Sequence, residues 1–232
     1  MKLPSLMLAL FFPALSAFGS PCVSATLQDY AALGSTGCTV ASPFQNILFS
    51  DFTPQTPSGS AIPASSILVA PATGLPGLVF TLAQAANPNE LFEAFFRFSI
   101  SGSGLIGLQA LLGDSSASLD GVVTGTLEGC GGASFAGPGG TCGGALITLI
   151  TVAGDGFSVP SDSIDLASLK SIDVFANITF DGGTLGSASG GSFTVQVVDT
   201  PEPSTAILTL SLLAGLAALK QRSRTRSSTP QS

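Results

Sequence analysis

The sequence predicts an all-β fold, a β-sandwich of jelly-roll-like type, with an N-terminal signal peptide and a single C-terminal transmembrane helix. Three observations support this prediction. Apolar residues in the central part recur with period two or in short runs, which is typical of strands. Gly, Ser, Pro and Asp bound these runs, and the 232 residues include 28 Gly and 15 Pro. Each end of the chain carries an uncharged apolar segment outside this alternating pattern.

Residues 1–19 have the form of a secretory signal peptide. A single lysine precedes an apolar stretch over residues 6–18, and small residues follow it. This order of positive, apolar and small residues is typical of an export signal. Cleavage after Gly19 leaves Cys22 in the mature chain, whereas the equally suitable site after Ala25 removes it.

Residues 20–199 are expected to form one exported domain. The segment 20–203 carries 14 acidic side chains against Arg97 and Lys170, for a net charge of −12. Charged residues make up only 9% of the chain and hydrophobic residues 45%, so the domain can bury a core. The sequence contains no His, which excludes serine triads and histidine-bearing metal sites. Because nucleic-acid phosphates require clustered cations, we expect no nucleic-acid partner, and we also expect no cofactor.

Nine strands are expected in this domain: residues 45–52, 66–70, 78–83, 94–101, 105–112, 118–127, 145–152, 171–180 and 192–199. In one of them, Phe96, Phe98 and Ile100 alternate with polar residues, so one face is expected in the core and the other in water. The strands at 171–180 and 192–199 show a similar alternation. The glycine-rich segment 129–144 is expected to be a loop.

Four cysteines in an exported chain usually form two disulfides, for which three pairings exist. We expect sequential pairing, Cys22 with Cys38 and Cys130 with Cys142, because each pair closes a short loop. This pairing favours signal cleavage before Cys22, since the later site would leave an odd thiol. A cysteine metal site is disfavoured because no spacing resembles CxxC.

Acidic residues offer two weaker candidate sites. Glu90 and Glu93 stand three apart, as a pair for glycoside hydrolysis, but a solvated turn explains them better. Asp162 and Asp165 suggest calcium, but they match no complete calcium loop. Asn177 begins a glycosylation-type tripeptide that is expected to be ordinary strand sequence. We therefore expect no catalytic residues.

The C-terminal segment 200–226 combines three features in order. Pro201, Glu202 and Pro203 precede an uncharged run over residues 204–219. As a helix this run reaches the short limit for spanning a bilayer. Four cations follow within seven residues and are expected at the cytoplasmic face, ahead of a short cytoplasmic tail, 227–232: Lys220, Arg222, Arg224 and Arg226.

This arrangement resembles the PEP-CTERM sorting signal of Gram-negative bacteria. The resemblance implies recognition of Pro201, Glu202 and Pro203 by an exosortase, a membrane cysteine protease-transpeptidase that removes the tail. The segment from Cys22 to Cys38 also resembles the N-terminal part of some PEP-CTERM proteins, where a disulfide ties a short helical turn to the first strand.

The resemblance implies a precursor anchored transiently in the inner membrane and a mature protein at the cell surface or in the extracellular matrix. Because PEP-CTERM systems are associated with exopolysaccharide and biofilm formation, a non-enzymatic envelope or matrix protein is the first expectation. A secreted polysaccharide-binding or polysaccharide-degrading protein that uses Asp and Glu is the alternative.

Overall fold

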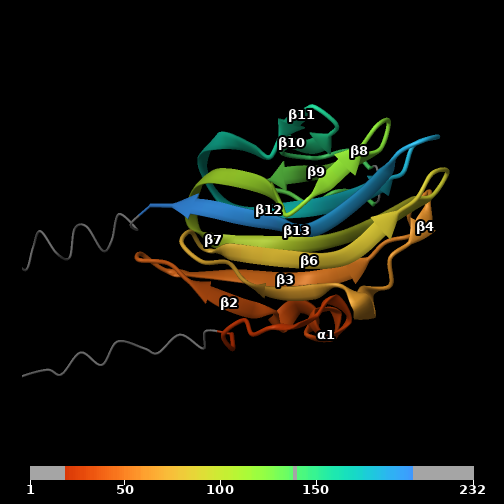
Figure 1. Cartoon of the computed structure of the whole chain (residues 1–232). Coiled ribbons are helices and arrows are strands. Elements are labelled where there is room, and N and C mark those ends of the chain that lie inside the picture. Colours follow the sequence, from red (N-terminus) through yellow and green to blue (C-terminus); the bar gives the residue numbers. More distant parts are fainter. Residues whose placement is uncertain (1–18, 138–139, 201–232) are drawn as a thin grey trace, which may run out of the picture.

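A computed structural model describes residues 19–137 and 140–200 (Figure 1). Residues 1–18 of the expected signal peptide, the Pro-Glu-Pro triplet, the apolar run and the basic cluster lie outside the described residues. Within the described ranges, no helix is long and apolar enough to cross a membrane.

The described chain is almost entirely β-structure. Its helices are α1 (Leu27–Ala32) and two 3₁₀ turns, Gly34–Thr36 and Ala64–Ser66. Its strands are β1 (Ala25–Thr26), β2 (Cys38–Ala41), β3 (Asn46–Pro54), β4 (Ser60–Ala61), β5 (Leu68–Pro71), β6 (Gly77–Ala86), β7 (Leu91–Gly113), β8 (Ser116–Ser118), β9 (Val122–Gly131), β10 (Ala145–Gly154), β11 (Phe157–Val159), β12 (Ser161–Asp181) and β13 (Ser187–Asp199).

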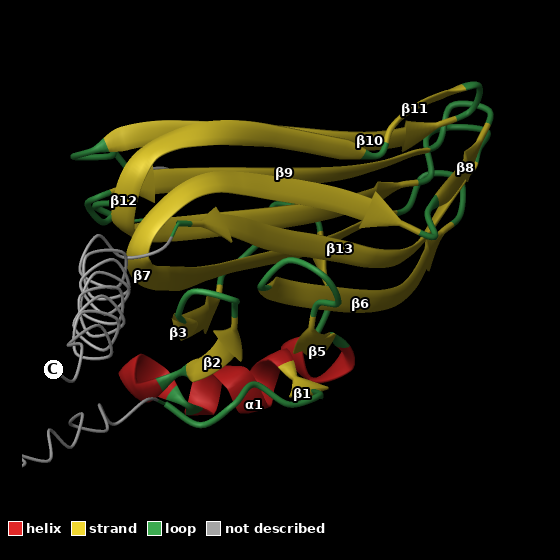
Figure 2. Cartoon of the chain, turned by 90° about the vertical axis from the view of Figure 1, so that its left-hand side faces the viewer, coloured by secondary structure: helices red, strands yellow, loops and turns green. Residues whose placement is uncertain are grey.

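These strands form one continuous hydrogen-bonded sheet that folds over into two layers, because β7 and β12 are long and bend sharply (Figure 2). We call the first layer sheet A; its order is β11, β10, β9, the second half of β12, the first half of β7, β3 and β2. Sheet B consists of β1, β5, β6, β13, the second half of β7 and the first half of β12. Strand β8 pairs with β13, and the short β4 runs parallel to β7.

The bend in β7 explains why its two halves looked like separate strands in the sequence. Gly102 and Gly104 interrupt the apolar alternation there, and Gly104 has a positive φ of 88° that favours glycine. The amide of Gln45 accepts a hydrogen bond from the Ser103 backbone and donates one to its carbonyl. The segment that reads as a turn is therefore a bend within one strand, and β12 bends beside it with register shifts between Asp165 and Ser171.

The core lies between the two sheets. Phe96, Phe98 and Ile100 are completely buried, as their alternation predicts. The Phe96 ring on sheet A lies 4.7 Å from the Phe80 ring on sheet B, centroid to centroid. Each such fully buried side chain contributes on the order of 1.5–3 kcal/mol through removal of apolar surface from water. The predicted all-β sandwich is therefore confirmed, whereas the jelly-roll-like topology stays a prediction.

The N-terminal segment contacts both sheets, because β1 pairs with β5 of sheet B and α1 packs against β3 of sheet A. Helix α1 begins with a capping box in which Thr26 and Asp29 exchange hydrogen bonds. The buried Tyr30 ring stands edge-on to Phe52 at 5.1 Å, and its hydroxyl donates to the Val23 carbonyl. A short helix therefore precedes β2, the first strand of sheet A along the chain.

Among the predicted boundaries that are wrong, two lie on either side of β9. The strand expected over 118–127 is shifted, because a turn with Leu119 at φ 54° separates β8 from β9. The glycine-rich loop is shorter than expected, since Gly129 and Gly131 lie in β9, where they pair with β10 and β12.

Candidate ligand-binding site

The outward face of sheet A carries a row of functional side chains. Glu128 on β9 lies directly opposite Phe175 on β12, and Phe175 lies opposite Arg97 on β7. Because alternate residues of a strand point to opposite faces, these three side chains face away from the core. Glu128 is exposed and Arg97 partly exposed, whereas only 3% of Phe175 is exposed.

A loop explains the burial of Phe175. The segment between Cys130 and Cys142, which we call the 130–142 loop, is described except for residues 138–139. It carries Phe135 onto Phe175, with 5.1 Å between ring centroids. The disulfide holds the two ends of the loop together. A side chain that the alternation predicts on the wet face is therefore covered by a distant segment.

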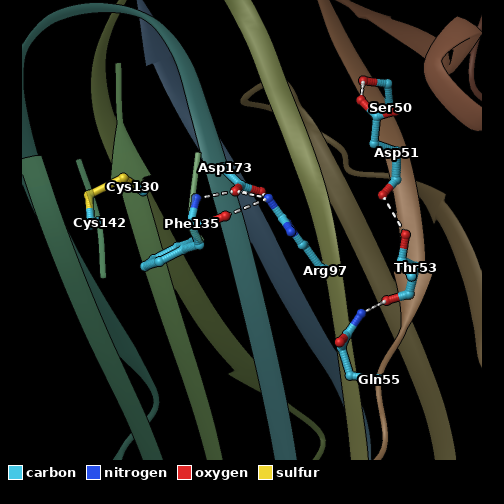
Figure 3. Close-up of polar contacts among 9 residues, drawn as sticks. All are labelled: Ser50, Asp51, Thr53, Gln55, Arg97, Cys130, Phe135, Cys142 and Asp173. Carbon is cyan, nitrogen blue, oxygen red and sulfur yellow. Dashed lines mark hydrogen bonds and ion pairs between the residues drawn. A yellow bond between two sulfur atoms is a disulfide. The ribbon is translucent and has the colours of Figure 1, made fainter. Parts of the chain in front are cut away.

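An ion pair fastens the loop to the sheet (Figure 3). The Asp173 carboxylate, 4% exposed, accepts from Nε of Arg97 at 2.8 Å and also from its Nη2. The same carboxylate accepts from the Phe135 backbone N–H at 2.8 Å, and Arg97 donates to the Phe135 carbonyl. The hydrogen bond from Arg97 to Asp173 raises the pKa of the guanidinium, and nearby Asp51 raises it further. The Arg97 guanidinium is thus hydrogen-bonded to Asp173 and to the loop. Its Cζ atom lies 5.4 Å from the centroid of the Phe175 ring.

The next row of the same face forms a pocket beside the loop. Thr126 on β9 lies opposite Asn177 on β12, and Asn177 lies opposite Phe95 on β7. With Glu128 and Phe175, these side chains line a hollow of about 200 Å³. The Phe95 ring is partly buried, 5.6 Å from the Phe175 ring, and forms the accessible aromatic wall.

Asn177 is the unusual member of this group. Its side-chain oxygen is buried, yet it accepts no hydrogen bond from the described residues. A buried acceptor without a donor costs about 1–3 kcal/mol in the free energy of unfolding, and because protein atoms cover this oxygen, it is closed to a ligand in this conformation.

A second hollow of about 320 Å³ lies beside α1, lined mainly by apolar groups that include Val23 and Leu33. Its carboxylate, Asp29, is occupied by the capping box, which lowers the pKa of this side chain. Its aromatic lining residue, Tyr30, is only 2% exposed, and the Tyr30 hydroxyl already donates to the Val23 carbonyl, so this hollow offers less aromatic surface than the sheet A pocket.

The carboxylates suggested by the sequence do not form a catalytic pair. Glu90 caps its own turn by accepting from the Asn87 backbone. Glu93, expected in a solvated turn, is instead in β7, only 7% exposed, and accepts from Ser58 and the Gly59 N–H. That expectation is wrong because a segment distant in sequence packs over Glu93.

The aspartates considered for calcium have structural surroundings. The Asp162 carboxylate accepts hydrogen bonds from the backbone N–H groups of Ile150 and Ser163. The bond from Ile150 on β10 joins the edge of sheet A to the edge of sheet B. Asp165 lies in the exposed first half of β12. The described ranges contain no group of three or more Asp, Glu or Cys side chains arranged to hold a metal ion. Asn177, as expected, is in a regular strand.

Both disulfides have the predicted sequential pairing, Cys22 with Cys38 and Cys130 with Cys142. Stable disulfides form in oxidising compartments, so the domain is extracytoplasmic. Cys22 is part of the folded domain and pairs with the start of β2. The sorting triplet and the basic cluster lie outside the described residues.

The pocket was missed in the sequence for an identifiable reason. The alternation assigns Phe95 to the outward face of its strand, together with the polar residue Arg97. An aromatic residue at such a position is a signal of a binding surface, but only the inward residues of this strand were used in the prediction from sequence. Thr126 belongs to a different predicted strand, 118–127, and Glu128 lies just beyond the predicted end of that strand. Nothing in a single sequence indicates that β12 lies between that strand and β7.

The comparisons with known proteins assign no family. No protein-family model matches the chain, and no curated protein matches it. Among solved structures, the chain is similar to TmCBM61 in complex with β-1,4-galactotriose, with a TM-score of 0.29 and 9% identity over 66% of this chain and 88% of that one. This degree of similarity is too low to place a ligand on the chain.

Proposed function

We propose that this protein is an exported, non-catalytic polysaccharide-binding protein of the cell envelope or extracellular matrix. The observation that carries the proposal is the pocket on sheet A, where the Phe95 ring stands beside carboxylate, amide and hydroxyl groups. The C–H face of a sugar ring packs against an aromatic ring, while its hydroxyls bond to polar groups of this kind. Three adjacent strands hold these groups, so little order must be gained on binding.

The dimensions of the pocket suit one sugar ring of a longer chain. Its volume, about 200 Å³, lies below the roughly 300–1,000 Å³ of pockets that enclose drug-sized ligands. The row of Phe95, Asn177 and Thr126 continues to Ile150 on β10, which is exposed. Three strand spacings of about 4.8 Å give a track of roughly 14 Å, longer than one ring. A polysaccharide can therefore extend along the sheet from an anchored ring.

Export and sorting complete the proposal. The signal peptide directs the chain across the inner membrane, and the PEP-CTERM segment holds the precursor there until an exosortase processes it. The extracytoplasmic disulfides support this route. The mature protein then carries its sugar-binding face at the cell surface or in the matrix.

A hydrolytic function is disfavoured by the composition of the pocket. Glycoside hydrolysis usually employs two carboxylates, about 5–10 Å apart across the scissile bond. Among the described residues that line the pocket, Glu128 is the single carboxylate. We therefore expect a hydrolysis screen of polysaccharides, esters and peptides to show no turnover.

Affinity electrophoresis of the purified full-length protein in gels containing individual polysaccharides tests the proposal. At least one neutral or basic polysaccharide should retard the protein, and Phe95→Ala should weaken binding about tenfold or more, the cost typical of losing a central aromatic anchor. Phe44→Ala is the matched control, since Phe44 is 49% exposed and lies outside the pocket. Absence of retardation by every polysaccharide, or unchanged binding by Phe95→Ala, would refute the proposal.

A further inference from the structure

The hydrogen-bonding character of the pocket restricts its ligand, given the polysaccharide binding proposed above. The Glu128 carboxylate only accepts hydrogen bonds, and the Asn177 side-chain oxygen is a buried acceptor without a donor. Thr126 adds a hydroxyl that can accept or donate. A ligand that matches the exposed Glu128 carboxylate must bring a hydrogen-bond donor to it.

The charge around the pocket favours a cation. Arg97 is the nearest cation along the sheet, but its guanidinium is paired with Asp173. Glu128 makes no ion pair among the described residues, and Asp51 adds a second carboxylate near Arg97. Lys170 precedes Phe175 by five residues, roughly 16 Å along the strand and beyond the Debye length at physiological salt. The negative charge at the pocket is therefore uncompensated.

The whole domain adds to this preference. The described ranges contain 13 carboxylates against Arg97 and Lys170, a formal charge of −11. Polysaccharides that carry carboxylate, sulfate or phosphate groups are repelled by such a surface. A sugar with a free amino group is attracted, and its ammonium supplies three donors to acceptors.

The register places Asn177 and Glu128 about one sugar ring apart. Glu128 and Asn177 lie on neighbouring strands, one diagonal step apart, because Glu128 pairs with Phe175 and Thr126 pairs with Asn177. Diagonal neighbours on one face are about 7–8 Å apart. A ring seated against Phe95 can therefore direct one substituent toward Asn177 and another toward Glu128.

We propose that the pocket recognises amino sugars with a free ammonium group, as in de-N-acetylated hexosamine polymers. The ammonium binds the Glu128 carboxylate, and the ring packs against Phe95 beside Asn177. This assignment rests on the proposed polysaccharide binding and adds the substrate class.

Calorimetric titration of the full-length protein with glucosamine oligomers and with N-acetylglucosamine oligomers of equal length tests the assignment. The free-amine oligomer should bind about tenfold more tightly at low salt, the effect of one hydrogen bond between charged groups. Because salt screens a partly exposed ion pair, this preference should fall to about twofold in 0.5 M NaCl. Glu128→Gln should remove the preference and retain the weaker binding of the acetylated oligomer.

Controls separate specific recognition from general attraction to an acidic protein. Asp114→Asn removes one exposed negative charge outside the pocket and should retain the preference. Polylysine, a cation without sugar rings, should not displace the oligomer at equal amine concentration. Equal binding of both oligomers, displacement by polylysine, or an unchanged preference in Glu128→Gln overturns the amino-sugar assignment and leaves the polysaccharide binding standing. If Phe95→Ala binds both oligomers as the wild type does, or if no glycan binds, the proposed function itself fails.

Discussion

Replacing Asp173 by Asn tests how the 130–142 loop is held against sheet A. The wild-type carboxylate accepts two hydrogen bonds from Arg97 and one from the Phe135 N–H, while only 4% exposed. Asn keeps one acceptor oxygen but turns an NH₂ group toward the donors of Arg97. Losing one charge-assisted hydrogen bond costs about 1.5–3 kcal/mol. Arg97 is 29% exposed, so water compensates part of its lost partner, and we expect a total loss of about 2–3 kcal/mol in the free energy of unfolding.

Urea unfolding of the full-length protein, followed by far-UV circular dichroism, measures this loss. Tyr30 is the single tyrosine and the chain has no tryptophan, so tyrosine fluorescence provides a second probe of the same transition. A loss of this size should lower the Tm by about 4–12 °C in a domain of this length. Asp114→Asn, an exposed aspartate, is the matched control and should change stability by about 0.5 kcal/mol or less.

A double-mutant cycle with Arg97→Gln then isolates the pair. We expect a coupling energy of about 1–3 kcal/mol between Arg97 and Asp173. If Asp173→Asn is as stable as the control, or if the coupling is near zero, the ion pair does not hold the loop and the reasoning is wrong.

Four further outcomes are expected. Burial raises the pKa of Tyr30 to about 12. Absorbance titration of the folded protein should therefore show a midpoint at this pH, against about 10 for the protein unfolded in urea. The contribution of the protonated Tyr30 to the free energy of unfolding is present below about pH 10 and is lost as the pH rises toward about 12. Hydrogen bonds from Thr184 and its neighbours lower the pKa of Asp120. The ionised Asp120 side chain therefore stabilises the fold above about pH 4, and this stabilisation is lost on acidification. In a plot of the urea midpoint against pH, Asp120→Ala should reduce the fall of the midpoint at acid pH. Cys142→Ser should increase hydrogen exchange in the 130–142 loop much more than it lowers the Tm, because Asp173 still holds the loop. In an exosortase-positive host, Glu202→Ala should accumulate full-length, membrane-held protein on immunoblots, whereas replacing the four cations after the apolar run with Ser should release uncleaved protein.

Local pattern was sufficient where a strand has one buried face and one wet face. Phe96 and Phe98 alternate with polar residues and are buried as expected, and both disulfides close short loops as expected. The first half of β12, Ser161 onward, was not predicted because it forms an edge of sheet B with mostly exposed residues and carries no strong alternation.

Contacts between distant segments account for the remaining differences. Glu93 is buried because Ser58 and Gly59 approach it from another part of the chain. Phe175 is buried because Phe135 reaches over the sheet. The pocket depends on the order of three strands, which local periodicity does not determine, so its residues could be recognised individually as outward-facing but not as neighbours.

The position of β13 has a mechanical consequence. This last described strand lies between β6 and β7 and leads directly toward the proposed membrane anchor. Tension transmitted through the anchor acts along the strand axis, so the ladders on both flanks are loaded in shear and must break together. A C-terminal strand at an edge would instead peel away one hydrogen bond at a time. A precursor tethered at this end can therefore bear load, because the tether pulls on an interior strand of sheet B.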